Sequence, residues 1–468
     1  MSTPRIVKLE SITRERHQVV HSYAVDQLRF STSIWYGELD LVQLGRERGE
    51  ASLRRLLFHS AVFELNKLCS LRPDLLDLGD YADLWTPALE ALWREIFHNV
   101  WAQWRYENDD PDYRGPRVIQ GATRADAPPI ERAGAGADTL LAFCGGGKDS
   151  LLMMRLLERA GARYDTLVYS SSIYGPAQLQ HQYVSQLTRR CDPGRVLRQW
   201  IYDDFMDSPV LELHPELGPR TLTAAETPSS VFNALPLALA HGYRGFCLGH
   251  ERSADGGQLV WERTGEEVNH QWGKSLAAER LISRYIREQL LVDFSYFSPL
   301  KPLHDLVIFG MLRDWEGDVP YTHSCNIRKP WCRACPKCLY VWLGYAAFLP
   351  REVVRAAVGA DDLLARPELV AGFRALMGLD GRQPFECIGG AEEVRVLLGA
   401  CARRGYEGPT IELFEREVGR EEARRLAARY LDVDLEATLL PAELRARLAP
   451  LLEVGAASAR GYLLAEES

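Results

Sequence analysis

Three consecutive glycines followed by Lys-Asp-Ser lie between an apolar run at residues 139–143 and an amphipathic stretch at residues 151–160. The apolar run predicts a buried strand. The stretch places Leu and Met on one stripe and Arg and Glu on the other face, which predicts a helix that ends at Gly161. Consecutive glycines turn tightly and offer bare N–H groups, and the positive end of the following helix favours an anion. The sequence therefore predicts a strand, a phosphate-binding turn and a helix.

Further apolar runs at residues 165–170 and 244–248, with a helical stretch at residues 229–240, continue this alternation. Alternating strands and helices predict an α/β fold with a parallel sheet covered by helices. The turn matches neither the Walker loop nor the dinucleotide fingerprint, since Asp149 stands where the Walker pattern needs Ser or Thr. A purely structural turn with Asp149 as helix cap is the alternative.

The length of 468 residues predicts two or three domains. We expect an aromatic-rich, largely helical region over residues 1–120, with helices near 50–68 and 87–104. A Gly-, Pro- and Ala-rich linker is expected at residues 121–137. The α/β domain is expected over residues 138–345 and a mostly helical region over residues 346–468.

The charge and the hydropathy pattern exclude several classes of protein. The net charge of −9 disfavours nucleic-acid binding through phosphate contacts. No apolar run approaches the length of a membrane span, and residues 1–18 lack the apolar core of a signal peptide. We expect a cytoplasmic protein with no nucleic acid, no membrane and no obligate protein partner.

Four of the 10 cysteines fall within fourteen residues, at Cys325, Cys332, Cys335 and Cys338. Four thiolates at such spacing predict a closed tetrahedral Zn²⁺ site. An iron–sulfur cluster and a set of unliganded buried thiols are the alternatives. A zinc ion with four protein ligands has no open position for water, so the predicted role is structural.

The glycine turn resembles the pyrophosphate-binding loop of the ATP pyrophosphatase (PP-loop) family, whose pattern is Ser-Gly-Gly-x-Asp-Ser. The matching residues are Gly146, Gly147, Asp149 and Ser150, and Gly145 stands in place of the first Ser. The resemblance implies a HUP-like, parallel-sheet domain that splits ATP between its α- and β-phosphates and transfers AMP to a substrate oxygen. It also implies that Lys148 and the backbone hold the departing pyrophosphate.

The later strand ends extend this resemblance. Ser170 and Ser171 stand where the family contacts adenine or ribose, and Gly249 and His250 stand near the α-phosphate. Asp149 and Asp255 are the expected ligands of Mg²⁺ or Mn²⁺. The alternative is that the serines only end a strand and that His250 is a turn residue. The cysteine spacing is similar to the structural zinc motif of cyano-deazaguanine synthases, which are also PP-loop enzymes.

One narrower family combines the glycine turn, the segments at residues 251–255 and 266–275, the Cys-Pro-Lys-Cys of the cluster and Pro-Phe-Glu-Cys at residues 384–387. These motifs resemble the UDP-N-acetylmuramoyl-L-alanyl-L-glutamate epimerases of bacterial peptidoglycan synthesis. The resemblance implies that ATP adenylates the terminal L-Glu of UDP-MurNAc-L-Ala-L-Glu. A base then removes the α-proton, and reprotonation on the other face with hydrolysis yields D-Glu, AMP and pyrophosphate.

Residue type alone selects the catalytic candidates, and each of them also has a structural interpretation. These candidates are Asp149, His250, Glu251, His270, Lys274 and Cys387. The expected counter-charges for a UDP-linked acid are Lys148, Lys274, Arg252 and Arg280. A PP-loop ligase or amidase of the cyano-deazaguanine synthase type is an alternative function, and a tRNA-modifying PP-loop protein is another.

Overall fold

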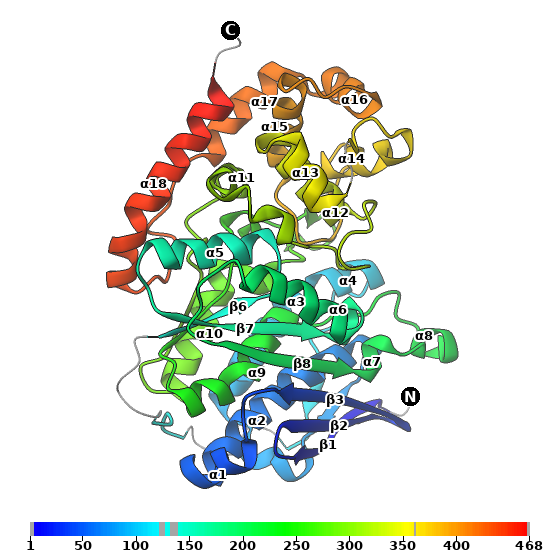
Figure 1. The fold of residues 1–468 in the computed structure, drawn as a ribbon. Coiled ribbons are helices and arrows are strands. Elements are labelled where there is room, and N and C mark those ends of the chain that lie inside the picture. Colours follow the sequence, from blue (N-terminus) through cyan, green and yellow to red (C-terminus); the bar gives the residue numbers. More distant parts are fainter. Residues whose placement is uncertain (1–3, 121–126, 132–138, 360–361, 466–468) are drawn as a thin grey trace.

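The computed structural model describes residues 4–120, 127–131, 139–359 and 362–465. The strands of these residues form a ten-stranded sheet and a separate two-stranded ribbon, and helices cover both faces of the sheet (Figure 1). The chain is therefore α/β with a mostly parallel sheet, as expected. Of the expected linker at residues 121–137, only residues 127–131 fall within the described part.

Five parallel strands of the described chain form the half of the sheet that carries the glycine turn. They are β6 (Leu140–Cys144), β7 (Tyr164–Ser171), β8 (Val196–Asp203), β9 (Gly245–Cys247) and β12 (Ser295–Phe297). Their order across the sheet is β12-β9-β6-β7-β8. The chain builds outward from β6 to β8 and then returns to place β9 on the other side of β6. The loops after β6 and β9 therefore diverge, and such a switch point leaves a crevice at the carboxyl ends of the strands.

The N-terminal region extends this sheet, which corrects the expectation of a largely helical region. Residues 6–36 form the antiparallel strands β1 (Ile6–Arg14), β2 (Gln18–Val25) and β3 (Leu28–Tyr36), and β3 pairs with β8. Two short strands, β4 (Leu75–Asp77) and β5 (Arg117–Val118), complete the edge. Buried and more exposed residues alternate along β1 and β2, as in strands that cover a core with one face. Of the tryptophans in this region, Trp35 lies in β3, and the other four lie further along the chain, at residues 85–104.

Two hydrophobic cores cover the two faces of the sheet. The first contains side chains of β1–β3 and of the helices α1 (Leu41–Arg48), α2 (Glu50–Leu65), α3 (Pro87–Val100), α4 (Ala102–Asn108), α9 (Glu226–His241) and α10 (Leu276–Gln289). The second contains side chains of α5 (Lys148–Arg159), α6 (Ala177–Thr188), α11 (Asp305–Met311) and α12 (Pro336–Phe348). In β6, Leu141 and Phe143 join the first core, whereas Ala142 and Cys144 join the second.

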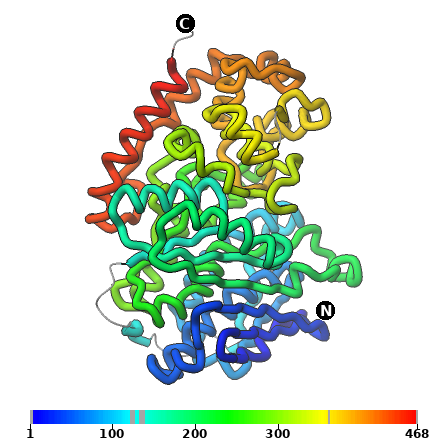
Figure 2. The backbone as a smooth tube through the Cα atoms, in the orientation of Figure 1, coloured from blue at the N-terminus to red at the C-terminus, as the bar shows by residue number. Residues whose placement is uncertain are grey.

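The C-terminal helices lie at the end of the molecule opposite to the N-terminal strands (Figure 2). They are α13 (Arg351–Val358), α14 (Val370–Leu376), α15 (Ala391–Arg403), α16 (Pro409–Glu417), α17 (Arg420–Ala427) and α18 (Ala442–Leu464). The long α18 packs on α11 and α5 and so joins this layer to the glycine turn. Among the described helices, none has both the length and the apolar character that a membrane span requires.

The remaining elements are short. They are α7 (Asp204–Asp207), α8 (Val210–Leu213) and the ribbon of β10 (Leu259–Trp261) with β11 (Glu266–Val268). The ribbon and the 3₁₀ turn at Trp272–Lys274 lie between β9 and α10 along the chain. This insertion and the segment before α15 both reach the crevice at the switch point.

Candidate active site

A pocket of about 270 Å³ opens at the carboxyl ends of β6, β7 and β9. Gly145 and Gly147 line it from the glycine turn, Tyr169 lines it from β7, and Gly249 and His250 line it from the loop after β9. This is the switch point of the sheet, where ligands of open α/β folds bind. The structure thus brings the predicted phosphate turn and the predicted Gly-His turn to one cavity.

The close packing of the glycine turn requires glycine at its second position. Gly146 has a φ of +88°, and a Cβ atom there would overlap the ring of His323. The backbone N–H of His323 donates to the carbonyl of Gly146 at 2.8 Å. At Gly249, a Cβ would lie 3.0 Å from the backbone of Asp149, so the two loops approach each other closely. Gly145, where the PP-loop pattern has Ser, has open space at its Cβ position.

Lys148 is buried, and its ammonium faces α11 and the first turn of α5. Its Nζ lies 2.5 Å from Oδ1 of Asp149 and 2.6 Å from Oδ1 of Asp305, and Tyr340 donates its hydroxyl to the other oxygen of Asp305 at 2.7 Å. The sequence predicted that this lysine would hold the departing pyrophosphate. The lysines that line the pocket are instead Lys274, Lys329 and Lys337.

Two carboxylates with opposite electrostatic environments lie at the glycine turn. Burial raises the pKa of Asp149 to about 6, with the charges of Glu251 and Asp305 adding to the effect of burial and Lys148 opposing it. Burial also acts on Glu251, but the ammoniums of Lys274 and Lys148 outweigh it and lower the pKa to about 2. Oε2 of Glu251 is buried and has no hydrogen-bond partner among the described residues. An unpartnered, ionised carboxylate oxygen beside a phosphate turn suits a divalent cation.

Asp255, the other predicted magnesium ligand, contributes to the framework around the pocket. Its Oδ1 accepts from the backbone N–H of Leu276 and from Nζ of Lys301, both at 2.9 Å. Lys301, which is fully buried, also donates to the carbonyls of Glu251 at 2.8 Å and Lys274 at 2.9 Å. Sequence reasoning missed Lys301, because its partners lie 27 to 50 residues away in the chain.

His250 lies in the pocket wall as a neutral imidazole. Burial lowers its pKa well below the usual value, and the nearby Lys274 and Lys301 lower it further. Its ring Nδ1 lies 3.4 Å from the hydroxyl of Tyr296. The hydroxyl of Ser298 contacts both the N–H and the carbonyl of His250, at 2.9 and 2.8 Å, and so holds its backbone.

The predicted Ser170 and Ser171 are buried at the end of β7, behind the pocket surface. Ser170 donates its hydroxyl to the carbonyl of Gln199 at 3.1 Å. The backbone of Ser171 exchanges hydrogen bonds with the side chain of Gln180, at 3.3 and 2.7 Å. The side chains of β7 and α6 that line the pocket are instead those of Tyr169 and Gln180.

The structure brings two of the predicted catalytic residues, Cys387 and His270, together with Glu386, and Cys387 lines the same pocket. The thiol of Cys387, a ring nitrogen of His270 and a carboxylate oxygen of Glu386 all lie within 4.8 Å of one another. Burial opposes ionisation of Cys387, yet the positive charges of Lys274 and Lys337 and a hydrogen bond with His270 lower its pKa to about 6. A thiol in this environment is largely thiolate near neutral pH.

A hydrogen-bond chain fixes the tautomer of His270. The amide nitrogen of Gln103 on α4 donates to Glu107 at 3.2 Å, so its Oε1 accepts from Nδ1–H of His270 at 2.7 Å. This bond leaves Nε2 as the ring nitrogen for Cys387. Although burial disfavours the charged ring, the Cys387 thiol raises the pKa of His270. The pair is therefore poised as thiolate and imidazolium.

Glu226 and Tyr174, which the sequence did not single out, line the same pocket. Tyr174 donates its hydroxyl to Oε2 of Glu226, and the ammonium of Lys329 lies 5.3 Å from the centre of the tyrosine ring. Burial raises the pKa of Glu226, and the negative charges of Cys387 and Glu64 raise it further. A glutamate in the first turn of a helix is common, so no local sequence signal distinguishes Glu226 as a site residue.

The four predicted metal-binding cysteines converge. The sulfurs of Cys325 and Cys335 lie 3.9 Å apart and those of Cys332 and Cys338 lie 3.7 Å apart, with all four within 4.8 Å. A tetrahedron with Zn–S bonds of about 2.3 Å has edges of roughly 3.8 Å, so the cluster could hold a single ion such as zinc. Four backbone N–H groups, at residues 327, 328, 335 and 338, point at the sulfurs from 3.3 to 3.4 Å, as expected around thiolate ligands.

The cysteine cluster also borders the active-site pocket. Asn326, Lys329 and Lys337 belong to the same segment and line the pocket. The amide of Asn326 donates to Oε1 of Glu386 at 2.9 Å, and the same oxygen accepts from the backbone N–H of Cys387 at 2.8 Å. The cluster therefore connects through one hydrogen-bond chain to the thiol that the sequence selected.

The two predicted arginine counter-charges lie elsewhere. Arg252 pairs with Asp432 at 3.1 Å and Asp434 at 3.4 Å, and so ties the loop after β9 to the C-terminal layer. Arg280 is exposed on α10 and lines a separate groove between α3 and α10. The cations that face the pocket are thus lysines.

Comparisons with known proteins agree with the resemblance drawn from the motifs. The MurL N-terminal domain model matches residues 227–299, and the MurL C-terminal domain model matches residues 321–424. These ranges contain Glu251, His270, Lys274 and Cys387, whereas the glycine turn precedes both.

Three curated relatives carry the name UDP-N-acetyl-alpha-D-muramoyl-L-alanyl-L-glutamate epimerase. The protein of Salinispora tropica is 32% identical over 327 residues, which are 67% of this chain and 66% of the relative. That of Micromonospora sp. is 31% identical over 332 residues, which are 68% of each chain. That of Xanthomonas oryzae pv. oryzae is 30% identical over 335 residues, 65% of this chain and 67% of the relative. The similarity thus spans about two thirds of the length of these relatives.

Proposed function

Since this chain belongs to the UDP-N-acetyl-alpha-D-muramoyl-L-alanyl-L-glutamate epimerase family, we propose that it inverts the terminal L-Glu of UDP-MurNAc-L-Ala-L-Glu at the expense of ATP. The observation that carries the proposal is one pocket that is lined both by the predicted phosphate-binding turn and by Cys387, whose thiol lies close to His270. The reaction needs a phosphate site as well as a base, because the carboxylate must be activated before the α-proton becomes acidic enough to be removed.

The chemistry explains why ATP is consumed. A free carboxylate resists loss of its α-proton because the resulting enolate carries a second negative charge. An acyl-adenylate has lost the carboxylate charge, so the same proton is far more acidic. Each pKa unit gained is worth about 1.4 kcal/mol, and a gain of only ~5 units lowers the barrier by roughly 7 kcal/mol. AMP and pyrophosphate are then the products, with no net redox change.

In this proposal the glycine turn binds the phosphates of ATP through its backbone N–H groups and the N-terminus of α5. The side chains of Lys274, Lys329 and Lys337 supply positive charge toward the pocket. Asp149 and Glu251 would hold Mg²⁺ or Mn²⁺, which supplies charge neutralisation for the leaving pyrophosphate. Burial of these groups strengthens each electrostatic contact, because water is excluded.

Cys387 is the proposed base for the α-proton of the L-glutamyl adenylate. Its thiolate is stabilised by His270 and Lys274, and both groups remain charged when the proton is transferred. Cys387 and the glycine turn line one cavity. A substrate bound there can place its carboxylate at the turn and its α-carbon at the thiol.

Zinc is the proposed ion of the cysteine cluster, with a structural role. Four protein sulfurs fill a tetrahedral shell and leave no position for a reacting water. The ion would instead fix the segment that presents Asn326, Lys329 and Lys337 to the pocket.

The test is incubation of the protein with UDP-MurNAc-L-Ala-L-Glu, ATP and Mg²⁺ in heavy water. We expect one AMP and one pyrophosphate per turnover, and D-Glu that carries one solvent deuterium at the α-carbon. Formation of a new amide with an added amine, or salt-dependent retention of tRNA with no turnover of the UDP-linked peptide, would refute the proposal.

A further inference from the structure

Inversion at carbon requires a proton to leave one face and another to arrive on the opposite face. A single thiol on one side of the substrate returns the proton to the side from which it came. A second proton-transfer group must therefore face the same cavity from another direction. Cys387 comes from the segment before α15, whereas Tyr174 and Glu226 come from the turn after β7 and the first turn of α9.

The N-terminal region holds the first turn of α9 in place. The backbone N–H of Ala225, next to Glu226, donates to the side chain of Asn66 at 2.9 Å. Ser229, one turn later, donates its hydroxyl to the carbonyl of Phe63 at 2.9 Å. These contacts join residues about 160 positions apart in the chain and fix where Glu226 enters the pocket.

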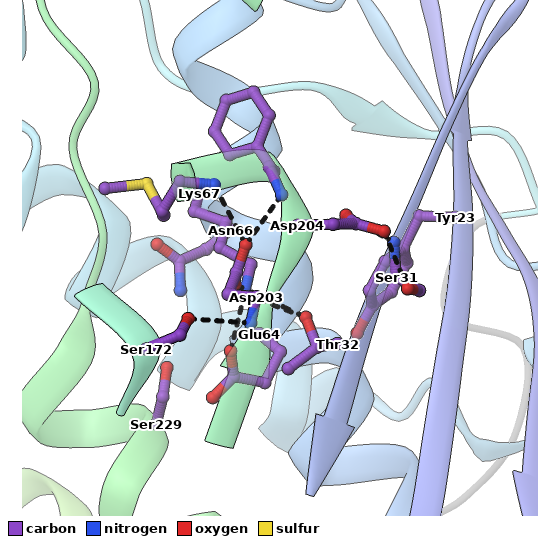
Figure 3. A network of polar contacts seen from close by, with 12 residues as sticks. Tyr23, Ser31, Thr32, Glu64, Asn66, Lys67, Ser172, Asp203, Asp204 and Ser229 are labelled. Carbon is purple, nitrogen blue, oxygen red and sulfur yellow. Dashed lines mark hydrogen bonds and ion pairs between the residues drawn. The ribbon is translucent and has the colours of Figure 1, made fainter. Parts of the chain in front are cut away.

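A buried charge network surrounds Lys67 (Figure 3). Nζ of Lys67 contacts Oε2 of Glu64 at 2.8 Å, the hydroxyl of Thr32 at 2.8 Å and a carboxylate oxygen of Asp203. Because the two carboxylates of Glu64 and Asp203 surround the single ammonium of Lys67, the network carries one excess negative charge. A small cavity of about 40 Å³ is bordered by this network and by Glu226, and the charge of Glu64 raises the pKa of the Glu226 carboxyl group.

Such surroundings favour the protonated carboxyl group. Glu226 is part-buried and faces the negative Glu64 and Cys387, and all three effects raise its pKa. The Tyr174 hydroxyl, which donates to Oε2, and the charge of Lys274 act in the opposite direction, but the net effect is a raised pKa. Glu226 and Cys387 line the same cavity from different segments of the chain. A protonated carboxyl group and a thiolate in one cavity are an acid and a base whose surroundings give them different proton affinities.

We propose that Glu226, held by Tyr174, is the second proton-transfer residue and protonates the α-carbon on the face opposite to Cys387. This inference rests on the proposed epimerase function. The Cα–H bond of the L-glutamyl adenylate breaks, its proton passes to Sγ of Cys387, and its electron pair delocalises onto the acyl oxygen. The enolate then takes the proton of Glu226 at Cα, and water hydrolyses the acyl phosphate to D-Glu and AMP. Exchange with solvent returns the proton to Glu226 and removes it from Cys387.

The test compares Glu226→Gln with Cys387→Ala in heavy water, in the full chain, with the L-Glu and D-Glu forms of the UDP-linked dipeptide. Release of AMP measures adenylation in the same samples. For Glu226→Gln we expect inversion to fall about 100-fold or more while deuterium still enters the recovered L-Glu substrate. For Cys387→Ala we expect the mirror result, with deuterium entering only the D-Glu form.

Two further variants complete the experiment. Tyr174→Phe should give a weaker version of the Glu226→Gln pattern, which a general loss of structure would not produce. Glu216→Gln is the matched control, because Glu216 is an exposed glutamate in the segment before α9 whose partner is His214.

The outcomes separate the inference from the proposed function. Wild-type inversion by Glu226→Gln, or loss of AMP release by both Glu226→Gln and Glu226→Asp, overturns the role of Glu226. Absence of ATP-dependent inversion in the unmodified protein overturns the proposed function instead. The crossed deuterium pattern with AMP release intact supports both.

Discussion

The two ends of the pocket are built in different ways. The proposed phosphate end is one continuous strand, turn and helix at residues 140–159, where backbone N–H groups are the main proposed ligands of the phosphates. The proton-transfer end gathers Glu226, His270, Lys274 and Cys387 from three separate segments. The first depends on local conformation, whereas the second depends on charges that meet only after folding. Variants at the two ends should therefore fail at different steps.

The largest effect is expected at the phosphate end. Asp149→Ala removes a carboxylate beside the glycine turn, while Lys148 keeps its contact with Asp305. We expect AMP release and epimerisation to fall together by about 1000-fold or more, because adenylation precedes proton transfer. A chromatographic assay of AMP, with circular dichroism to show that the fold is kept, measures this. An undiminished rate of AMP release would disprove the assignment of the phosphate end.

Cys387→Ser should instead separate the two steps. Serine is a far weaker acid than the thiol, so Lys274 and His270 cannot keep it ionised near neutral pH. We expect formation of D-Glu to fall 100- to 10,000-fold while AMP release stays within about threefold. The matched control is Cys191→Ser, a part-buried cysteine between α6 and β8. An equal loss of D-Glu and of AMP would contradict the assignment of the two ends of the pocket to different steps of the reaction.

A smaller effect is expected from pH. The pKa of Cys387 is lowered to about 6 by Lys274, Lys337 and His270 against burial, with the carboxyl groups of Glu226 and Glu386 nearby. The thiolate is present above this value and is lost as the pH falls through it. The yield of D-Glu per AMP released should therefore drop about tenfold per pH unit below 6. This ratio cancels any titration that acts on adenylation, and a ratio that stays constant from pH 7 to pH 5 would contradict the role of Cys387.

The smallest effect on turnover is expected from the cysteine cluster. Cys332→Ser removes one of four sulfurs, so bound zinc should be lost and the melting temperature should fall by several degrees. Since Lys329 and Lys337 lie between or beside these cysteines, we expect a rise in the KM for ATP of about tenfold with a smaller change in kcat. Elemental analysis and thermal denaturation measure the first two quantities. A protein that never contains zinc, or that loses it without loss of stability, would exclude a structural zinc site.

The regions that sequence reasoning predicted share a local cause. The strand, glycine turn and helix around residues 144–150 follow from glycine conformation and hydrophobic periodicity, and the structure contains each of them. The convergence of the four cysteines follows from their close spacing. The three N-terminal strands were missed because the tryptophans at residues 85–104 dominated the composition, although residues 6–36 show the alternation of strands.

The site residues divide in the same way. The sequence alone determined that a glycine turn joins a strand to a helix at residues 145–147 and which side chains have suitable chemistry, because both depend on neighbouring residues. Only the tertiary structure decided that Lys148 forms an ion pair with Asp305 and that Asp255 forms one with Lys301. It also decided that Glu226 lines the pocket. The physical reason is that ionisation and pairing of a buried charge depend on what folding places beside it. Those neighbours lie tens to hundreds of residues away in the chain.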